Sequence, residues 1–105
     1  MSGTVWLALC HDAPGAPALR REHLAAHLAH VAAHIADYAV AGPLSNAPSP
    51  GGETTGSALA VRAPDAAAAR AFIETDPYAR AGVWARIDIF GWKPVAGGWV
   101  GGITW

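Results

Sequence analysis

Four histidines at helical spacing are the first feature of this sequence that could carry chemistry. They recur at steps of four, three and four residues, at His23, His27, His30 and His34. On an α-helix, which turns by about 100° per residue, these side chains fall within roughly 60° of one another and form one stripe. An imidazole can act as a general acid or base near neutral pH, bind a metal, or form hydrogen bonds along the polar shoulder of a helix.

The metal interpretation has limited support in the sequence. His23 and His27 have the i, i+4 spacing of a zinc-binding helix, but no glutamate follows in the needed place and no third ligand is evident. Cys10 is the only cysteine, which rules out a thiolate cluster, and its apolar surroundings suggest an inert buried thiol. We therefore expect no metal and no organic cofactor. For His27, His30 and His34 a structural role is the simplest interpretation.

Proton transfer is the third interpretation, and His23 is its main candidate because it lies in the first turns of the expected helix. Asp76 ends the second expected helix, where a carboxylate opposes the helix dipole and usually has another partner. If the two helices lie side by side, we expect His23 to meet Asp76, which would fix the imidazole tautomer. The alternative is that Asp76 merely caps the turn at Pro77.

Four further residues are candidates for contacts with a substrate in the same cleft. Arg20, one turn from His23, could bind an anionic oxygen, or it could simply be a solvated arginine at a helix start. Ser57 follows a glycine and could donate a hydrogen bond into the cleft or close a turn. Tyr78 could line the cleft or pack in the core. His27 completes this set of candidates.

The elements that must position these residues can be inferred from periodicity and breakers. Apolar runs predict four strands, at 4–11, 40–44, 57–62 and 84–92. Two helices are expected at 18–38 and 66–75, the second capped by Asp65, with a tight connector at 78–82. The first helix has a second stripe, which we expect to face the core: Leu24, Leu28, Val31 and Ile35. Gly42-Pro43 indicates either an edge strand or an early end of the strand, and 45–56 is a breaker-rich loop.

This order, β-α-β-β-α-β, predicts an α+β fold with the ferredoxin-like split βαβ arrangement and a four-stranded antiparallel sheet. Two helices cover only one face of such a sheet, yet the first strand is apolar on both faces. We therefore expect a homodimer whose sheets pack together in a dimeric α+β barrel. The chain is a single domain, with a core at 1–93 and a tail at 94–105 that forms an extra strand or an arm on another subunit.

Composition excludes several classes of protein. The chain has 105 residues, of which 52% are hydrophobic and 14% charged, and a net charge of -1. It lacks the basic patch that nucleic-acid binding requires. Its first apolar run, 5–10, is too short for a signal peptide or a membrane span. We expect a cytoplasmic protein that binds neither nucleic acid nor membrane.

Several short motifs, taken in order, resemble the YciI-like (YCII-related) family across almost the whole chain, from the first strand to about Trp92. They are Arg20-x-x-His23-Leu24, Ala41-Gly42-Pro43, Gly56-Ser57, Asp76-Pro77-Tyr78 and Ala81-Gly82-Val83-Trp84. The resemblance implies a ferredoxin-like fold in a dimeric α+β barrel, with a His–Asp pair that by position would be His23 and Asp76. The tryptophan-rich tail after Lys93 departs from the family.

These observations lead to one functional hypothesis and one alternative. The hypothesis is a small cofactor-independent enzyme that uses a His–Asp pair to move a proton on a small cyclic or aromatic substrate, in a lyase or isomerase reaction such as dehydrochlorination. The alternative is a non-catalytic protein that binds a small molecule or assists a biosynthetic pathway.

Overall fold

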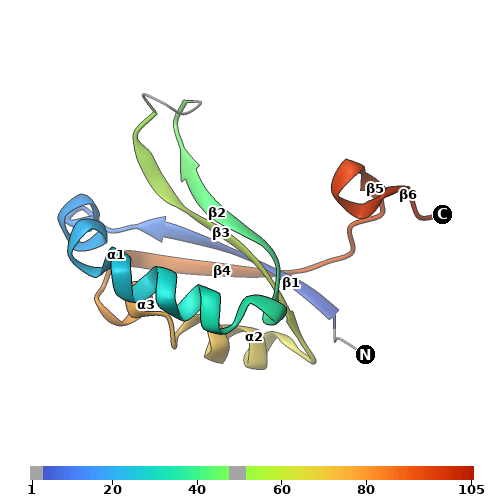
Figure 1. The fold of residues 1–105 in the computed structure, drawn as a ribbon, viewed down its shortest axis with the longest axis horizontal. Helices are drawn as coiled ribbons and strands as arrows, with labels where there is room; N and C mark the ends of the chain where they lie inside the picture. The colour runs from blue at the N-terminus through green and yellow to red at the C-terminus, as the bar shows by residue number, and fades with distance from the viewer. Residues whose placement is uncertain (1–3, 48–51) are drawn as a thin grey trace.

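A four-stranded antiparallel sheet organises the protein (Figure 1). The computed structural model describes residues 4–47 and 52–105. The strands of the sheet lie in the order β2-β3-β1-β4 and span β1 (Thr4–Asp12), β2 (Tyr38–Ser45), β3 (Thr54–Ala63) and β4 (Trp84–Trp92). The edge position predicted for the strand that contains Pro43 is confirmed, since β2 pairs only with β3. A proline is tolerated there because an edge strand leaves some amide groups unpaired.

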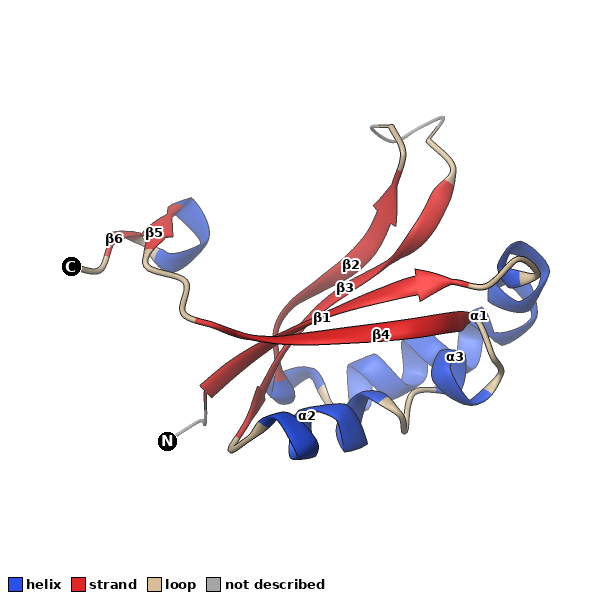
Figure 2. Ribbon diagram, turned by 180° about the vertical axis from the view of Figure 1, so that it is seen from behind, coloured by secondary structure: helices blue, strands red, loops and turns tan. Residues whose placement is uncertain are grey.

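The three α-helices and the 3₁₀ turn that follows the first of them cover one face of this sheet (Figures 1 and 2). They are α1 (Ala16–Ala33), the 3₁₀ turn η1 (Ile35–Asp37), α2 (Ala66–Ile73) and the single turn α3 (Pro77–Arg80). The element order and the strand order are those of the ferredoxin-like arrangement, which confirms the predicted fold class. No helix of the described chain is long and apolar enough to cross a bilayer.

Several boundaries differ from the sequence prediction. The first helix begins two residues earlier than expected, with Pro17 in its first turn, and it ends at Ala33. The predicted loop at 45–56 is shorter, because β2 and β3 extend further, and Asn46 and Glu53 bond across its base. Residues 48–51 of that loop lie outside the described part of the chain.

The core lies between the sheet and the helices. Its most buried side chains come from β1, β3, α2 and the segment before β4: Ala8, Cys10, Leu59, Val61, Ala69, Ile73 and Val83. The strand residues among them alternate, because Ala8 pairs with Leu59 and both point to the helix side. Because neighbouring residues of β1 point to opposite faces of the sheet, Ala8 and Cys10 are buried beneath the helices, and the apolar residues that alternate with them point to the face that the helices do not cover.

The prediction that the leucine stripe of the first helix faces the core is wrong for Leu24, Leu28 and Ile35, whereas Val31 does pack against the core. Leu24 and Leu28 are 46% and 56% exposed, whereas His23 and His27 are only partly exposed. The histidine side turns inward because the fully buried carboxylate of Asp76 needs hydrogen-bond donors, which a leucine cannot supply.

The second face of the sheet carries no helix and exposes apolar side chains. Val40, Leu44, Phe90 and Trp92 lie on this open face and are exposed. The chain after β4 does not add a strand to the four-stranded sheet, which excludes the first of the two alternatives predicted for the tail; the second, an arm on another subunit, stays a prediction. It forms a separate hairpin of β5 (Ala96–Gly97), η2 (Gly98–Val100) and β6 (Gly102–Ile103), which projects beyond the end of β4 (Figures 1 and 2).

The N-cap of α2 provides a test of the fold. The Asp65 carboxylate accepts the backbone N–H of Ala68 at 2.8 Å. Asp65→Ala removes this acceptor and should lower the free energy of unfolding by about 1 kcal/mol, measured by urea denaturation. Asp65→Asn, which retains a capping oxygen, should remain close to wild type. Equal losses in the two variants would contradict the assigned cap.

Candidate active site

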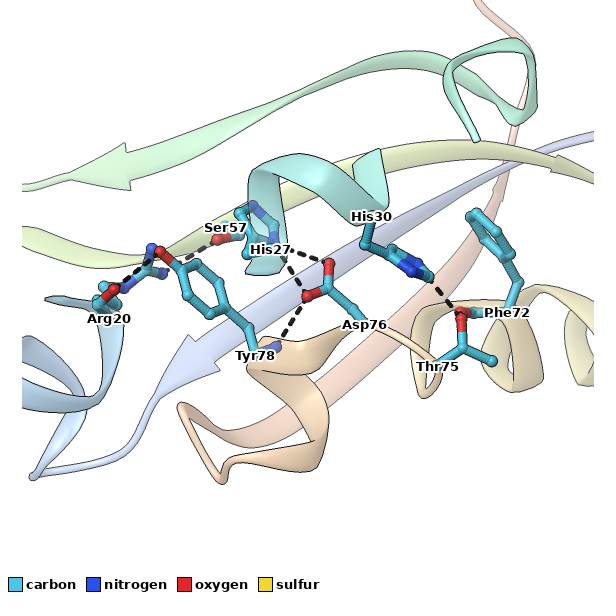
Figure 3. Close-up of polar contacts among 8 residues, drawn as sticks. All are labelled: Arg20, His27, His30, Ser57, Phe72, Thr75, Asp76 and Tyr78. Atoms are coloured by element: carbon cyan, nitrogen blue, oxygen red, sulfur yellow. Dashed lines mark hydrogen bonds and ion pairs between the residues drawn. The ribbon is translucent and has the colours of Figure 1, made fainter. Parts of the chain in front are cut away.

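A hydrogen-bonded histidine and aspartate join α1 to the start of α3 (Figure 3). Nδ1 of His27 lies 2.8 and 2.9 Å from the two carboxylate oxygens of Asp76. The Asp76 side chain is fully buried, while the His27 side chain retains some exposure. When Nδ1–H donates to the carboxylate, the neutral ring carries its unprotonated nitrogen at Nε2, which is the arrangement of a general base.

Asp76 also caps α3. Its carboxylate accepts the backbone N–H of Tyr78 at 2.8 Å, and Pro77 occupies the first turn, where its missing N–H costs nothing. The turn cap predicted for Asp76 is therefore present, and its carboxylate also has a histidine partner, which is His27 and not the expected His23. The cap restrains the carboxylate from one side, and the imidazole binds it from the other.

Tyr78 holds the imidazole in place. Its ring stacks on that of His27, with centroids 3.9 Å apart and planes inclined by 5°, and its hydroxyl donates to the carbonyl oxygen of Arg20 at 3.3 Å. Burial raises the pKa of the Tyr78 hydroxyl, which therefore stays protonated at neutral pH. Tyr78 packs as a rigid support and also lines the pocket described below.

The expected contact between His23 and Asp76 is wrong. His23 is paired instead with the exposed Glu22, its Nε2 lying 2.9 Å from the glutamate oxygen. The residue of α1 that lies opposite α3 is one helical turn further along, at His27. The two histidines share one stripe, so periodicity identified the residue type and the helix face but could not select the turn.

Arg20 lies at the hydroxyl end of the Tyr78 side chain, and its guanidinium group is held by hydrogen bonds to other residues of the protein. Its Nε and Nη2 donate to the two carboxylate oxygens of Asp12, both at 2.8 Å, and Nη2 also bonds Ser57 Oγ at 3.0 Å and Gly56 O at 3.1 Å. Burial lowers the pKa of Arg20, but the hydrogen bonds and charge of Asp12 outweigh it and raise that pKa overall. Sequence reasoning missed Asp12, for which a carboxylate at the end of a buried strand was the available signal.

Gly56 sets the position of Ser57. Gly56 is buried, and a Cβ atom there would collide with the backbone carbonyl of Cys10 on the neighbouring strand. Only glycine permits this close approach of β3 to β1. The approach places both Ser57 Oγ and the Gly56 carbonyl within reach of Arg20.

A pocket of about 310 Å³ lies beside these groups, between α1 and the edge of the sheet. Its polar lining comes from Arg20, His27, Ser57 and Tyr78. Its apolar lining comes from α1, β2 and β3: Leu24, Leu28, Val31, Ala41, Gly42, Pro43 and Leu59. The leucines of the stripe that the sequence assigned to the core therefore form one wall of this pocket. All the predicted substrate-contacting residues line it, whereas His23 does not.

The remaining histidines lie elsewhere. His30 and His34 pack around Phe72, and His30 is 3.4 Å from Thr75 Oγ1 (Figure 3). Within residues 4–47 and 52–105, no three histidine, cysteine or acidic side chains are grouped so as to hold a metal ion. His11, on the open face, bonds Asp88 at 2.9 Å, and this hydrogen bond lowers the pKa of the Asp88 carboxyl.

Fold and site together define a class of protein: a split βαβ domain in which a histidine paired with a buried carboxylate faces a small, largely apolar pocket. The model of the YCII-related domain matches residues 4–93, and the chain belongs to this family. A similar solved structure is the 5-chloro-2-hydroxyhydroquinone dehydrochlorinase from Burkholderia phenoliruptrix AC1100, in complex with 2,5-dihydroxybenzoquinone. The two are 31% identical, with a TM-score of 0.76, over 90% of this chain and 96% of that one. No curated protein matches the sequence significantly.

Cys10 lies beneath the site and should not react. Burial first, and the nearby Asp76 charge second, raise the pKa of its thiol to about 12, so at pH 8 almost none is thiolate. We expect folded protein to resist a disulfide-exchange reagent at pH 8 and guanidinium-unfolded protein to react fully. Ala36→Cys, at an exposed position, serves as the reactive control. Equal rates for Cys10 and that control would contradict the burial of this thiol.

Proposed function

We propose that this protein is a cofactor-independent enzyme that transfers a proton on a small cyclic or aromatic substrate, with His27 as the general acid–base and Asp76 as its orienting partner. The observation that carries the proposal is the 2.8 Å contact between a fully buried carboxylate and an imidazole that lines a pocket. A buried carboxylate that fixes an imidazole tautomer is a recurrent way of preparing a histidine for proton transfer.

The similar solved structure adds chemical direction. It is a dehydrochlorinase in complex with 2,5-dihydroxybenzoquinone, a six-membered ring bearing oxygens. A pocket of about 310 Å³ accommodates a single ring with its substituents. We infer the same general type of reaction here, an elimination or isomerisation on a ring that carries a carbonyl or hydroxyl group.

The proposed step begins when Nε2 of His27 removes a proton from a ring carbon or hydroxyl next to a carbonyl. The released electron pair forms a new double bond. In an elimination a leaving group departs from the adjoining carbon with its bonding electrons, and in an isomerisation the imidazolium returns the proton elsewhere on the ring. Asp76 stabilises the imidazolium in either case. Ser57 and Arg20 are neighbours in the lining of the pocket, where together they can hydrogen-bond the substrate oxygen.

The proposed base is His27, whereas the sequence favoured His23, and substitution of each histidine tests this assignment directly. His27→Gln should reduce turnover by about 10²-fold or more, whereas His23→Gln should leave it near wild type, because His23 neither contacts Asp76 nor lines the pocket. The measurement is chloride release and solvent deuterium exchange across a panel of chlorinated hydroquinones and cyclic enones. Melting temperatures of both variants control for folding.

The outcomes separate the hypotheses. Turnover that survives in His27→Gln removes the proposed base. Ligand binding that persists in wild type and His27→Gln, without turnover in either, favours the alternative of a non-catalytic binding protein.

We also propose that the protein is a homodimer that buries the open face of its sheet. Phe90 and Trp92 of β4 are exposed at one edge of this face and Val40 and Leu44 of β2 at the other, and α1, α2, α3 and η1 all lie on the opposite face. Such an apolar surface is characteristic of an interface. Packing two such faces together is the assembly that the sequence analysis expects for this fold.

Light scattering after size exclusion tests the assembly. The wild type should have about twice the chain mass of 10.8 kDa. Phe90→Glu should shift it to monomer, because a charge would be buried without a partner at the interface. The control is Ile35→Glu, since Ile35 is comparably exposed but belongs to η1 rather than to the open face. A monomeric wild type would refute the proposed homodimer.

A further inference from the structure

Among the described residues that line the pocket, Arg20 is the one cation, and a neighbouring carboxylate already neutralises its charge. Arg20 lines the pocket, and Asp12 binds it from behind through two hydrogen bonds of 2.8 Å. Asp76 adds a second carboxylate behind His27. One positive and two negative groups therefore surround the site, which carries a net single negative charge while His27 is neutral.

The other titratable groups near His27 do not alter this balance. On α1 these are His23, paired with the exposed Glu22, and His30, which contacts Thr75. Tyr78 packs on the imidazole itself, and Cys10 lies on the sheet below. Burial raises the pKa of both the tyrosine hydroxyl and the thiol, so both stay uncharged at neutral pH.

A ligand anion in this pocket gains little from Arg20. The attraction of the guanidinium is offset by the carboxylates of Asp12 and Asp76, which lie behind Arg20 and His27. The cost of removing the anion from water remains. The wall formed by Leu24, Leu28 and Leu59 adds to that cost, because it offers no hydrogen bonds. An uncharged ligand avoids the desolvation cost and still contacts the apolar wall.

We propose that Asp12 sets the ligand class of this pocket, which selects uncharged single-ring compounds that carry a hydrogen-bonding oxygen and excludes anions unless a proton is taken up with them. A neutral phenol, enol or cyclic ketone fits this description. This inference rests on the proposed function only in placing the ligand beside His27, and it specifies the substrate class of that site.

The same charge balance determines whether the proton that His27 accepts comes from the ligand or from solvent. A neutral enol or phenol enters with its own proton, which His27 Nε2 can accept as the substrate oxygen becomes an anion, so the complex gains no net charge. A carboxylate arrives without that proton, and His27 must bind one from solvent to restore the same balance. Anion binding should therefore be coupled to proton uptake, and neutral-ligand binding should not.

Benzamide and benzoate form a matched pair of probes, since they share a shape and differ in charge. By calorimetry at a pH where NMR titration shows His27 to be neutral, wild type should bind benzamide at least about tenfold more tightly than benzoate. Benzoate binding should take up close to one proton, measured in buffers of different ionisation enthalpy, and benzamide binding should take up none. 2,5-Dihydroxybenzoquinone, whose hydroxyls are vinylogous carboxylic acids, should behave like benzoate.

Asp12→Asn tests the residue itself. It leaves Arg20 without its counter-charge, so the preference should shift toward benzoate by at least about tenfold. Asp37→Asn, which removes an exposed carboxylate of η1 that does not line the pocket, should leave the preference unchanged. If Asp12→Asn fails to fold, the proton-uptake measurement on wild type still decides.

Tighter benzoate binding by wild type, or benzoate binding without proton uptake, would overturn the inference. So would an unchanged preference in folded Asp12→Asn. The proposed function fails separately, through absent turnover or turnover that survives in His27→Gln, and neither result changes the expected binding preference.

Discussion

The carboxylate of Asp76 is the constraint on which the arrangement of the site depends. It is fully buried, and a buried carboxylate without donors would cost far more than a domain of this size can tolerate. Its donors come from two directions: the backbone N–H of Tyr78, fixed by the turn of α3, and Nδ1 of His27, carried by α1. Satisfying this group therefore fixes how α1 is rotated about its own axis.

That rotation explains where sequence reasoning succeeded and where it failed. The strands, the second helix and its cap at Asp65 follow from local signals, and the structure reproduces them closely. The orientation of the first helix does not follow from local signals, because its leucine and histidine stripes lie about 100° apart and each is a reasonable inward face. The leucine stripe has the greater transfer free energy, yet the need of Asp76 for a donor decides the matter.

The same limit applies to the site. Asp76 was identifiable because the sequence placed it at the expected end of the second helix, where the dipole disfavours a carboxylate, although α2 in fact ends at Ile73 and Asp76 is the N-cap of α3. The partner's residue type was identifiable from the stripe. The choice between His23 and His27 depends on which turn of α1 lies opposite the start of α3, and this is set by tertiary packing. Asp12 was missed for a related reason, since its bond to Arg20 joins the end of a strand to a helix across a connecting turn that no periodicity describes.

One helix thus supplies both halves of the pocket. Its inward side provides His27 and Arg20, which are held by the carboxylates of Asp76 and Asp12, while its outward side provides Leu24 and Leu28, which form an apolar wall. The acids and the leucines act on different properties: the acids fix charge and tautomer, and the leucines fix shape and solvation. Because Leu24 and Leu28 are exposed and take no part in the His27–Asp76 contact, substitutions in this wall can change the shape of the pocket without disturbing that contact. The shape of the pocket and its polar groups can therefore vary independently in this fold.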